Sequence, residues 1–184
     1  MRSNEGWTGR FYEDFEVGDV YRSPLGRTVT EADNVWFTLL TMNTNQAHFN
    51  SHAAVRSPFE RPLVNSTFTL AVVLGLTVID TSQNAFANLG WEKIELPAPV
   101  FVGDTLYAET AVLERRESQS RPWAGIVKVL TRGLNQRGEV VLSYVRSFYI
   151  HKRSSPHRAD AAFPEAAYPI TEDVDGWIDE GAPG

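Results

Sequence analysis

The sequence contains no cysteine, which excludes disulfide bonds and thiolate chemistry. Long hydrophobic runs are also absent: the longest apolar stretch, 70–76, includes Gly75 and is much shorter than the roughly 20 residues that a membrane-spanning helix needs. Residues 1–10 are polar and lack the apolar core of a signal peptide. These absences lead us to expect a cytoplasmic protein that does not associate with membranes.

An excess of positive charge is missing as well. The net charge is −6 at pH 7, and the sequence has no basic stripe of the kind that nucleic-acid binding requires. We therefore expect no nucleic-acid partner. The densest basic cluster follows the last predicted strand, where we interpret it as part of a solvated tail: His151, Lys152, Arg153, His157 and Arg158.

The composition that remains is that of an ordinary globular protein. With 184 residues, 42% hydrophobic and 22% charged, the chain is long enough for one domain with a substantial core. We expect a polar N-terminal segment at 1–10, a single domain at 11–152 and a C-terminal tail at 153–184, in which the strand pattern is lost.

The first predicted helix begins after Thr30, a residue type that caps helices well, and has acidic residues in its first turn. It should run to about Met42 and bury Val35, Leu39 and Met42 or close neighbours. The segment 43–64 that follows is rich in Asn, His, Ser and Pro, and we expect it to be irregular with short helical turns.

A second, central helix is predicted over 66–80, because Leu70, Val73, Leu74 and Val78 follow helical spacing. Several of its residues are β-branched and are poor helix formers, so packing must sustain it.

The second half of the chain predicts strands. Gly-Asp pairs at 18–19 and 103–104 read as turns that start strands, and 135–138 reads as a hairpin turn. The expected strands are 19–23, 91–96, 105–114, 125–131 and 139–150. One long helix followed by consecutive strands indicates an α+β fold, in which an antiparallel sheet wraps around the helix.

Two neighbouring motifs carry the functional signal. Asn43-Thr-Asn-Gln-Ala-His48 is followed by Pro58-Phe-Glu-Arg-Pro-Leu-Val-Asn-Ser66. They resemble the active-site segment of the (R)-specific enoyl-CoA hydratases, the MaoC-like dehydratases of the hot dog fold, which reads roughly Asp-x-Asn-Pro-x-His and then Phe-x-Arg-Pro-Ile-Val-His-Gly. Asn45 and His48 match this pattern, whereas Asn43 replaces the aspartate and Asn65-Ser66 replace His-Gly.

The resemblance implies the hot dog fold, which the strand and helix pattern predicts separately, and a hydration reaction. Adding water to an enoyl thioester requires a base for the water, an acid for Cα and a sink for enolate charge. His48 is the candidate acid/base, because imidazole titrates at about pH 6.5 and can work in either direction. By resemblance, the oxyanion donor is the backbone amide of Ser66 at the start of the central helix.

Asn43 cannot act as a base, and we expect it to orient water or substrate instead. A closer resemblance, specific at 41–50, 58–70 and 97–106, is to the branch that acts on mesaconyl-CoA or itaconyl-CoA, which are dicarboxylic enoyl thioesters. Neutral asparagines would avoid repelling the substrate carboxylate, and an arginine could pair with it. The expected substrate-binding residues are Asn45, Arg61, Asn65 and Arg121.

Some features have two readings. Arg121 lies in the loop 118–123, which could hold a CoA phosphate or be a surface turn, and 97–106 could line an acyl-CoA channel or be a plain hairpin. His48 and His52 have the spacing of a metal pair on a helix, but no third ligand is evident, so no metal and no cofactor are expected.

Two rival functions stay open. A hot dog acyl-CoA thioesterase should have an acidic residue on the central helix, and 65–79 has none. A catalytically silent acyl-CoA binding or regulatory protein is favoured only by Asn43. In each case the expected partners are an acyl-CoA and further copies of the same chain, at least as a homodimer, because one sheet around one helix leaves apolar surface uncovered.

Overall fold

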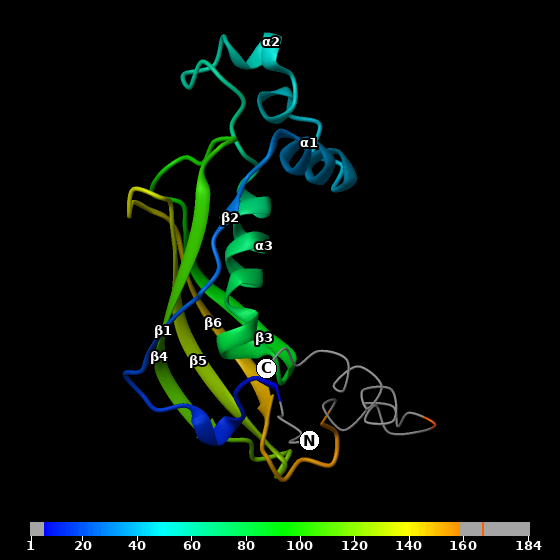
Figure 1. Ribbon diagram of the computed structural model, residues 1–184, viewed down its shortest axis with the longest axis vertical. Coiled ribbons are helices and arrows are strands. Elements are labelled where there is room, and N and C mark those ends of the chain that lie inside the picture. The colour runs from blue at the N-terminus through cyan, green and yellow to red at the C-terminus, as the bar shows by residue number, and fades with distance from the viewer. Residues whose placement is uncertain (1–5, 159–166, 168–184) are drawn as a thin grey trace, which may run out of the picture.

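The central helix α3 (Ser66–Leu76) lies along the inner face of a curved antiparallel sheet (Figure 1). The computed structural model describes residues 6–158 and residue 167. The sheet order in this part of the chain is β1 (Val20–Arg22), β4 (Thr105–Glu117), β5 (Ala124–Leu134), β6 (Val140–His151) and β3 (Ala85–Glu95), and the short β2 (Arg27–Thr28) also pairs with β4. This is the hot dog arrangement, so the predicted fold class is confirmed.

The strands β4, β5 and β6 begin within a residue of their predicted starts. The predicted hairpin turn lies between β5 and β6: Gly138 has φ 77°, and the Asn135 backbone amide donates to the Glu139 carbonyl at 3.0 Å. β3 instead begins at Ala85, well before the predicted start at 91. Its pairing with β6 shifts register three times. These irregularities break the alternation of polar and apolar residues that identifies a strand from sequence.

The helix α1 (Glu31–Leu40) has the predicted cap: the Asp33 amide donates to Thr30 Oγ1 at 3.2 Å, and the Thr30 amide donates to Asp33 Oδ2 at 2.8 Å. The prediction of its buried face was wrong. Leu39 and Met42 are 51% and 83% exposed, while the polar Asn34 and Thr38 are buried. The polar stripe turns inward because it bonds to the segment around His48 and Asn65, as described below, and this leaves Leu39 and Leu40 exposed, while Phe37 still packs against Phe68.

The helix α3 is capped by Asn65 and buries Phe68, Thr69 and Val73 against the sheet. It ends at Leu76 and is followed by a π-helical turn, η3 (Val78–Ser82), so the predicted helix 66–80 is slightly too long. Val78, predicted to face the core, is partly exposed, because a π turn holds more residues than an α turn and rotates the face. Among the described residues, no helix is long and apolar enough to cross a membrane.

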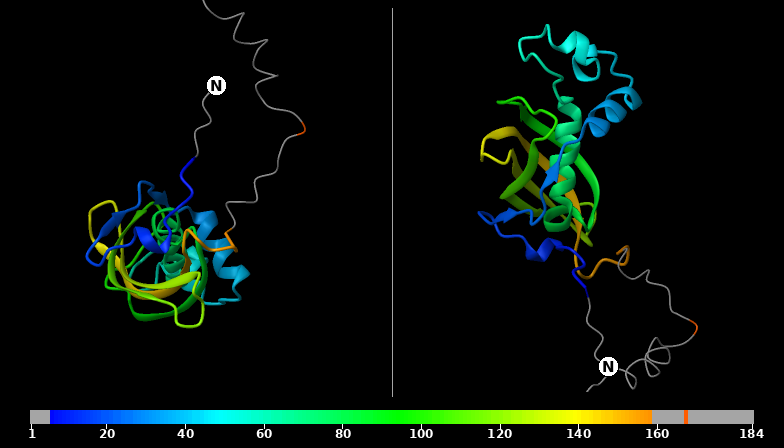
Figure 2. Two further views of the ribbon diagram at one scale, coloured as in Figure 1. Left: turned by 90° about the horizontal axis from the view of Figure 1, so that it is seen from below. Right: turned by 45° about the horizontal axis from the view of Figure 1, so that its top comes forward.

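The loop regions gather at one end of α3. The short η2 (Gln46–His48) and α2 (Ser51–Ala54) lie beside α1 beyond the end of the sheet, where the expected irregular segment is found (Figure 2). The continuous described stretch 6–158 begins and ends at the opposite end (Figure 1), where η1 (Tyr12–Asp14) packs against β5.

The predicted basic tail is solvated only in part where the structure describes it: Arg153 and His157 are exposed, whereas the residues before them pack against the domain. His151 is the last residue of β6 and is buried, with its ring stacked 5.5 Å from that of Trp123. Lys152 forms an ion pair with Glu117. The aromatic and acidic partners therefore anchor residues 151–152 to the domain. The predicted tail beyond 158 lies outside the described residues, apart from residue 167.

Arg146 is an unusual member of the inner face of β6. It is 3% exposed, its guanidinium stacks 4.6 Å from the Phe148 ring, and its Nε atom has no hydrogen-bond partner in the described part of the chain. No ion pair with Arg146 is found there either. Burial lowers the pKa of this guanidinium. A buried cation without a counter-charge opposes folding.

We predict that Arg146→Met raises the free energy of unfolding by about 1–4 kcal/mol, because it replaces an uncompensated buried charge with an unbranched apolar side chain that occupies the place of the aliphatic stem of the arginine. Urea unfolding at fixed protein concentration measures the change. Arg132→Met, which removes an exposed ion pair with Glu109 on β4, is the control and should change the stability by less than about 1 kcal/mol. A loss of stability in Arg146→Met would mean that an anion outside the described residues pairs with it.

Candidate active site

His48 is held in one orientation by the backbone. It ends the short helix η2, and its Nδ1 atom lies 2.8 Å from the Leu63 carbonyl oxygen. A carbonyl can only accept a hydrogen bond, so Nδ1 must carry a proton. In the neutral ring the other nitrogen, Nε2, then has a free lone pair, and no described residue is bonded to it. The ring is thus set to take up a proton at Nε2.

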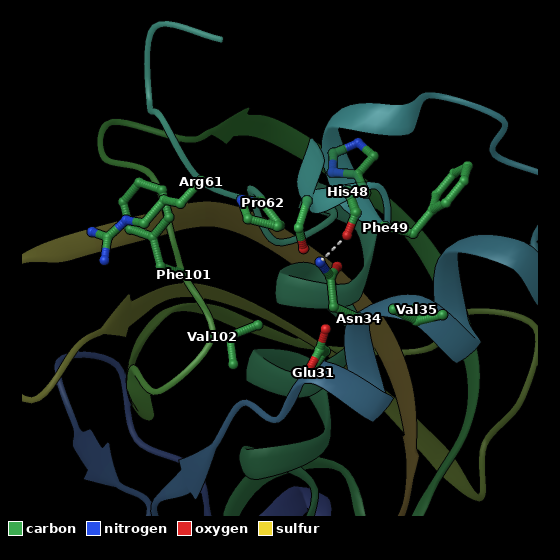
Figure 3. Close-up of a pocket in the computed structure, with 10 residues that line it drawn as sticks. Glu31, Asn34, Val35, His48, Phe49, Arg61, Pro62, Phe101 and Val102 are labelled. Atoms are coloured by element: carbon green, nitrogen blue, oxygen red, sulfur yellow. Dashed lines mark hydrogen bonds between the residues drawn. The ribbon is translucent and has the colours of Figure 1, made fainter. Parts of the chain in front are cut away.

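His48 lines a cavity of about 190 Å³ at the end of α3 (Figure 3). The close-up shows His48 and Phe49 on one side of it and Arg61, Phe101 and Val102 on the other. The remaining lining residues are Glu31, Asn34, Val35, Ser51 and Pro62. The cavity therefore combines one imidazole and one charge of each sign with mainly apolar walls, a composition typical of ligand sites.

Among the lining residues that the sequence did not identify as site residues, two have a side chain that matters for the chemistry of the site. Glu31 was assigned only to the acidic first turn of α1, although it adds a carboxylate to the cavity. Asn34 is 1% exposed, and its Nδ2 donates to the carbonyl of His48 at 2.7 Å. A signal for Asn34 exists in the sequence: Thr30, Asn34 and Thr38 form a polar stripe at helical spacing in a helix that is mostly apolar after its acidic first turn.

The predicted residues Asn43 and Asn45 shape the loop that carries His48. The Asn43 Oδ1 atom accepts from the Asn45 amide at 3.0 Å, and the Asn45 Oδ1 atom accepts from the Ala47 amide at 3.1 Å, which caps η2. Neither residue lines the cavity of His48. The side-chain amide nitrogen of Asn43 has no partner among the described residues. Asn45 acts as the cap of η2.

Asn65 and Ser66 form the start of α3. Asn65 is 2% exposed; its Oδ1 accepts from the Thr67 amide at 3.0 Å and its Nδ2 donates to Thr38 Oγ1 at 3.2 Å. Both ends of this amide are used inside the protein, which corrects the prediction that Asn65 contacts substrate. Ser66 is the first residue of the helix, where backbone amides have no intrahelical acceptor, and no described residue accepts from its amide.

Ser66 lines a second cavity, of about 240 Å³, together with Phe59, Leu63, Val64, Thr69 and the residues 96–100. This cavity adjoins that of His48 along the segment 59–63, where Leu63 forms a β-bridge with Phe101. His48 and Ser66 therefore lie on two sides of one segment and do not share a cavity in this structure. The 97–106 block lines both cavities, as the channel reading predicts.

Arg61 and Arg121 differ in their relation to the site. The Arg61 guanidinium lies 3.6 Å from the centre of the Phe101 ring, and within the described chain it forms no ion pair, so its charge is available to a ligand. Arg121 stacks 4.9 Å from the Tyr149 ring in the loop between β4 and β5. The 13 residues of β4 separate this loop from the site (Figure 1), so the structure does not bring Arg121 to His48.

Asp104 fixes the turn that presents Phe101 to the cavity. Its Oδ2 atom accepts from the Phe101 amide at 3.0 Å, and its Oδ1 atom accepts from Gln136 Nε2 at 2.8 Å. Burial opposes the charge of Asp104, but these hydrogen bonds and the nearby Arg137 guanidinium outweigh it and hold the pKa of the carboxyl below its ordinary value. Gly103, at φ 94°, supplies the left-handed conformation that the turn requires.

We predict that Asp104→Asn lowers the free energy of unfolding at pH 7 by about 1–3 kcal/mol, because charge-assisted bonds are lost. A carboxyl with a lowered folded-state pKa stabilises the protein above its unfolded pKa of about 3.9, and this contribution disappears as the pH falls through the folded pKa. The difference between wild type and variant should therefore shrink below about pH 4.

Urea unfolding at pH 7 and at several values between about pH 5 and pH 3 checks this dependence. Asp19→Asn is a matched control, because Asp19 occupies the other Gly-Asp turn and accepts from the Glu16 amide in the same way without an arginine partner. A difference that stays constant with pH in Asp104→Asn would contradict the role assigned to the charge.

Comparison with known proteins gives consistent matches over most of the chain. A family model described as mesaconyl-CoA hydratase matches residues 2–175. The chain is 38% identical over 168 residues to the mesaconyl-CoA hydratase of Cereibacter sphaeroides, which covers 91% of this chain and 48% of that protein. It is 34% identical over 165 residues to the beta-methylmalyl-CoA dehydratase of Chloroflexus aurantiacus, which covers 90% of this chain and 46% of that protein.

A solved structure shows the same relationship. The crystal structure of a MaoC domain protein dehydratase from Chloroflexus aurantiacus is similar with a TM-score of 0.77 and 33% sequence identity, over 91% of this chain and 46% of that chain. The chain thus spans about half the length of the curated relatives that it matches.

Proposed function

Because this chain belongs to the mesaconyl-CoA hydratase family, we propose that it adds water to, or removes water from, a short branched enoyl-CoA, with mesaconyl-CoA and itaconyl-CoA as candidate substrates. The family match confirms the resemblance that the motifs carry. The observation that supports the chemistry is the imidazole of His48, held by the Leu63 carbonyl so that Nε2 is the free nitrogen in a cavity that also holds the unpaired Arg61.

In the proposed reaction, His48 Nε2 removes a proton from water while the oxygen adds to Cβ of the enoyl thioester. The electrons move to the thioester oxygen, which in this proposal reaches past the segment 59–63 into the adjoining cavity, where the Ser66 amide and the α3 dipole stabilise the negative charge. His48 then returns the proton to Cα, which completes the addition of one water; dehydration is the reverse. No cofactor or metal takes part in this proposal.

The substrate carboxylate would pair with Arg61, which stacks on Phe101 at the mouth of the cavity. Asn43 lies in the loop that carries His48 and does not line this cavity, so its proposed role is to orient water or a part of the substrate that extends to that loop. Its side-chain amide nitrogen has no partner among the described residues and can donate there, and an uncharged residue adds no repulsion to that of Glu31, which does line the cavity.

The decisive assay follows crotonyl-CoA, mesaconyl-CoA and itaconyl-CoA in parallel. Loss of absorbance of the conjugated thioester supports hydration, whereas release of free CoA thiol would identify a thioesterase. Binding without either change would identify a silent acyl-CoA binding protein, the reading that Asn43 favours. The absence of an acidic residue on α3 argues against the thioesterase.

We predict that His48→Ala lowers turnover by roughly a hundredfold or more, because it removes the proposed acid/base group. His52→Ala is the matched control, since His52 lies on the adjacent helix α2 and does not line the cavity. Its effect should be much smaller. Steady-state kinetics with the best of the three substrates gives the answer, and equal activity of the wild type and His48→Ala would remove His48 from the mechanism.

We predict that Arg61→Ala lowers the specificity constant for mesaconyl-CoA relative to crotonyl-CoA by about tenfold, equivalent to about 1.4 kcal/mol, because only mesaconyl-CoA has a free carboxylate on its acyl group. Arg56→Ala changes an exposed arginine of the same segment that does not line either cavity, and should leave the ratio unchanged. Equal losses on both substrates in Arg61→Ala would assign the arginine to the CoA part of the substrate.

We also propose that a second copy of the chain covers the apolar face left open by α1 and the edge of the sheet. Trp36 and Leu40 on α1 are 75% and 78% exposed. The strand β3 ends the sheet, and its outer edge has no partner among the described strands, although Leu89 and Ile94 on it are exposed and apolar. Open apolar strand edges are normally covered.

A cytoplasmic location and the absence of a nucleic-acid partner remain predictions.

Light scattering at micromolar concentration tests this assembly and should give at least twice the mass of 20.6 kDa. Trp36→Asp places a charge in the proposed interface and should shift the protein toward the monomer. A wild-type protein that is monomeric at this concentration would exclude the homodimer.

A further inference from the structure

We infer that Asn34 is a positioning residue that holds the acid/base group and the oxyanion donor in one fixed frame. The inference deepens the proposed function and rests on it for its catalytic meaning. Asn34 lies on α1, whereas His48 and the start of α3 belong to two other segments (Figure 3).

The side chain of Asn34 makes three hydrogen bonds to backbone groups. Its Nδ2 donates to the carbonyls of His48 at 2.7 Å and Leu63 at 3.2 Å, and its Oδ1 accepts from the Asn65 amide at 2.9 Å. Only one orientation of the amide satisfies all three groups, because carbonyls accept and an N–H donates. The arrangement therefore specifies asparagine and excludes the isosteric aspartate.

The Leu63 carbonyl is shared between Asn34 and the catalytic ring. It accepts from Asn34 Nδ2 and from His48 Nδ1 at the same time, using both lone pairs. Asn34 thus orients the group that determines which nitrogen of His48 carries the proton. Water cannot easily substitute for this bond, because Asn34 is almost completely buried.

The third bond couples the ring to the oxyanion site. Asn65, whose amide donates to Asn34, is the cap of α3 and directly precedes Ser66. One side chain therefore sets the position of His48 relative to the Ser66 amide, across the segment that separates the two cavities. Such groups must be held closely in register for the proposed addition to proceed.

Asn84 provides a matched comparison at the far end of the molecule. It is 9% exposed, and its Nδ2 also bridges two carbonyls, those of Thr8 at 3.0 Å and Arg10 at 3.2 Å. Aspartate at either position loses two donated hydrogen bonds and places a charge in a poorly hydrated site, so both variants should lose stability. Only the one at Asn34 should alter the catalytic ring.

The experiment compares wild type, Asn34→Asp and Asn84→Asp. Nitrogen-15 NMR of the imidazoles should show His48 of the wild type as the Nδ1–H tautomer. In Asn34→Asp we expect a mixture of tautomers and a rise of about one pH unit in the titration midpoint of His48, because the carboxylate favours the imidazolium. Glu31 and Arg61 line the same cavity as the ring and His52 lies on the adjacent helix α2, and all three are unchanged in both variants.

Kinetics should agree with the NMR. For Asn34→Asp, kcat should fall by about tenfold or more with a small change in KM, and the acid limb of kcat/KM should move to higher pH together with the His48 titration. Asn84→Asp should keep the wild-type tautomer, kcat and pH profile while its unfolding midpoint falls. If Asn34→Asp does not fold, the uncharged and shorter Asn34→Ser replaces it. We expect this variant also to show a mixture of His48 tautomers and a lower kcat.

An Asn34 variant that loses stability but keeps the His48 tautomer and the pH profile would overturn the inference. The NMR measurement does not depend on turnover. A wild type that hydrates no enoyl thioester would therefore refute the proposed function, while the tautomer and titration of His48 would still decide whether Asn34 positions the ring.

Discussion

The Leu63 carbonyl accepts two hydrogen bonds in a place that water reaches poorly, and the geometry of the site depends on it. His48 and Asn34 both donate to this oxygen, and Asn34 extends the connection to the cap of α3. Three segments that are distant in sequence are thereby fixed to one another without a disulfide, a metal or a long element. Each bond alone contributes only about 1 kcal/mol, but leaving one of these buried groups unpaired would cost more.

The rest of the fold supplies the rigid base for this junction. The sheet buries one face of α3 through Phe68 and Val73, and the first turn of the helix lies near the end of the sheet that faces the loops. Asp104 fastens the turn before β4 and so places Phe101 between the two cavities. The sheet therefore provides position, and the loops at its end provide the chemical groups, a division common in enzymes.

The sequence predicted features that depend on local chemistry. The Thr30 cap, the start of α3 and the turn at Gly138 were all recognised, since each follows from residues within a few positions of one another. The orientation of α1 was predicted wrongly, because hydrophobic spacing alone places its apolar stripe inside. Asn34 faces inward because its hydrogen-bond partners lie 14 to 31 residues away in the sequence. A local sequence pattern cannot predict such partners.

The same reasoning links the site to the surface that we expect a second copy to cover. α1 buries Asn34 and Thr38 on one side and exposes Trp36 and Leu40 on the other. Because a helix of 10 residues moves as a unit, its outer contacts and its inner hydrogen bonds constrain the same body. A partner packed on the outer face would restrict α1 and with it Asn34, so the precision with which the His48 ring is held would depend on assembly as well as on the fold of one chain.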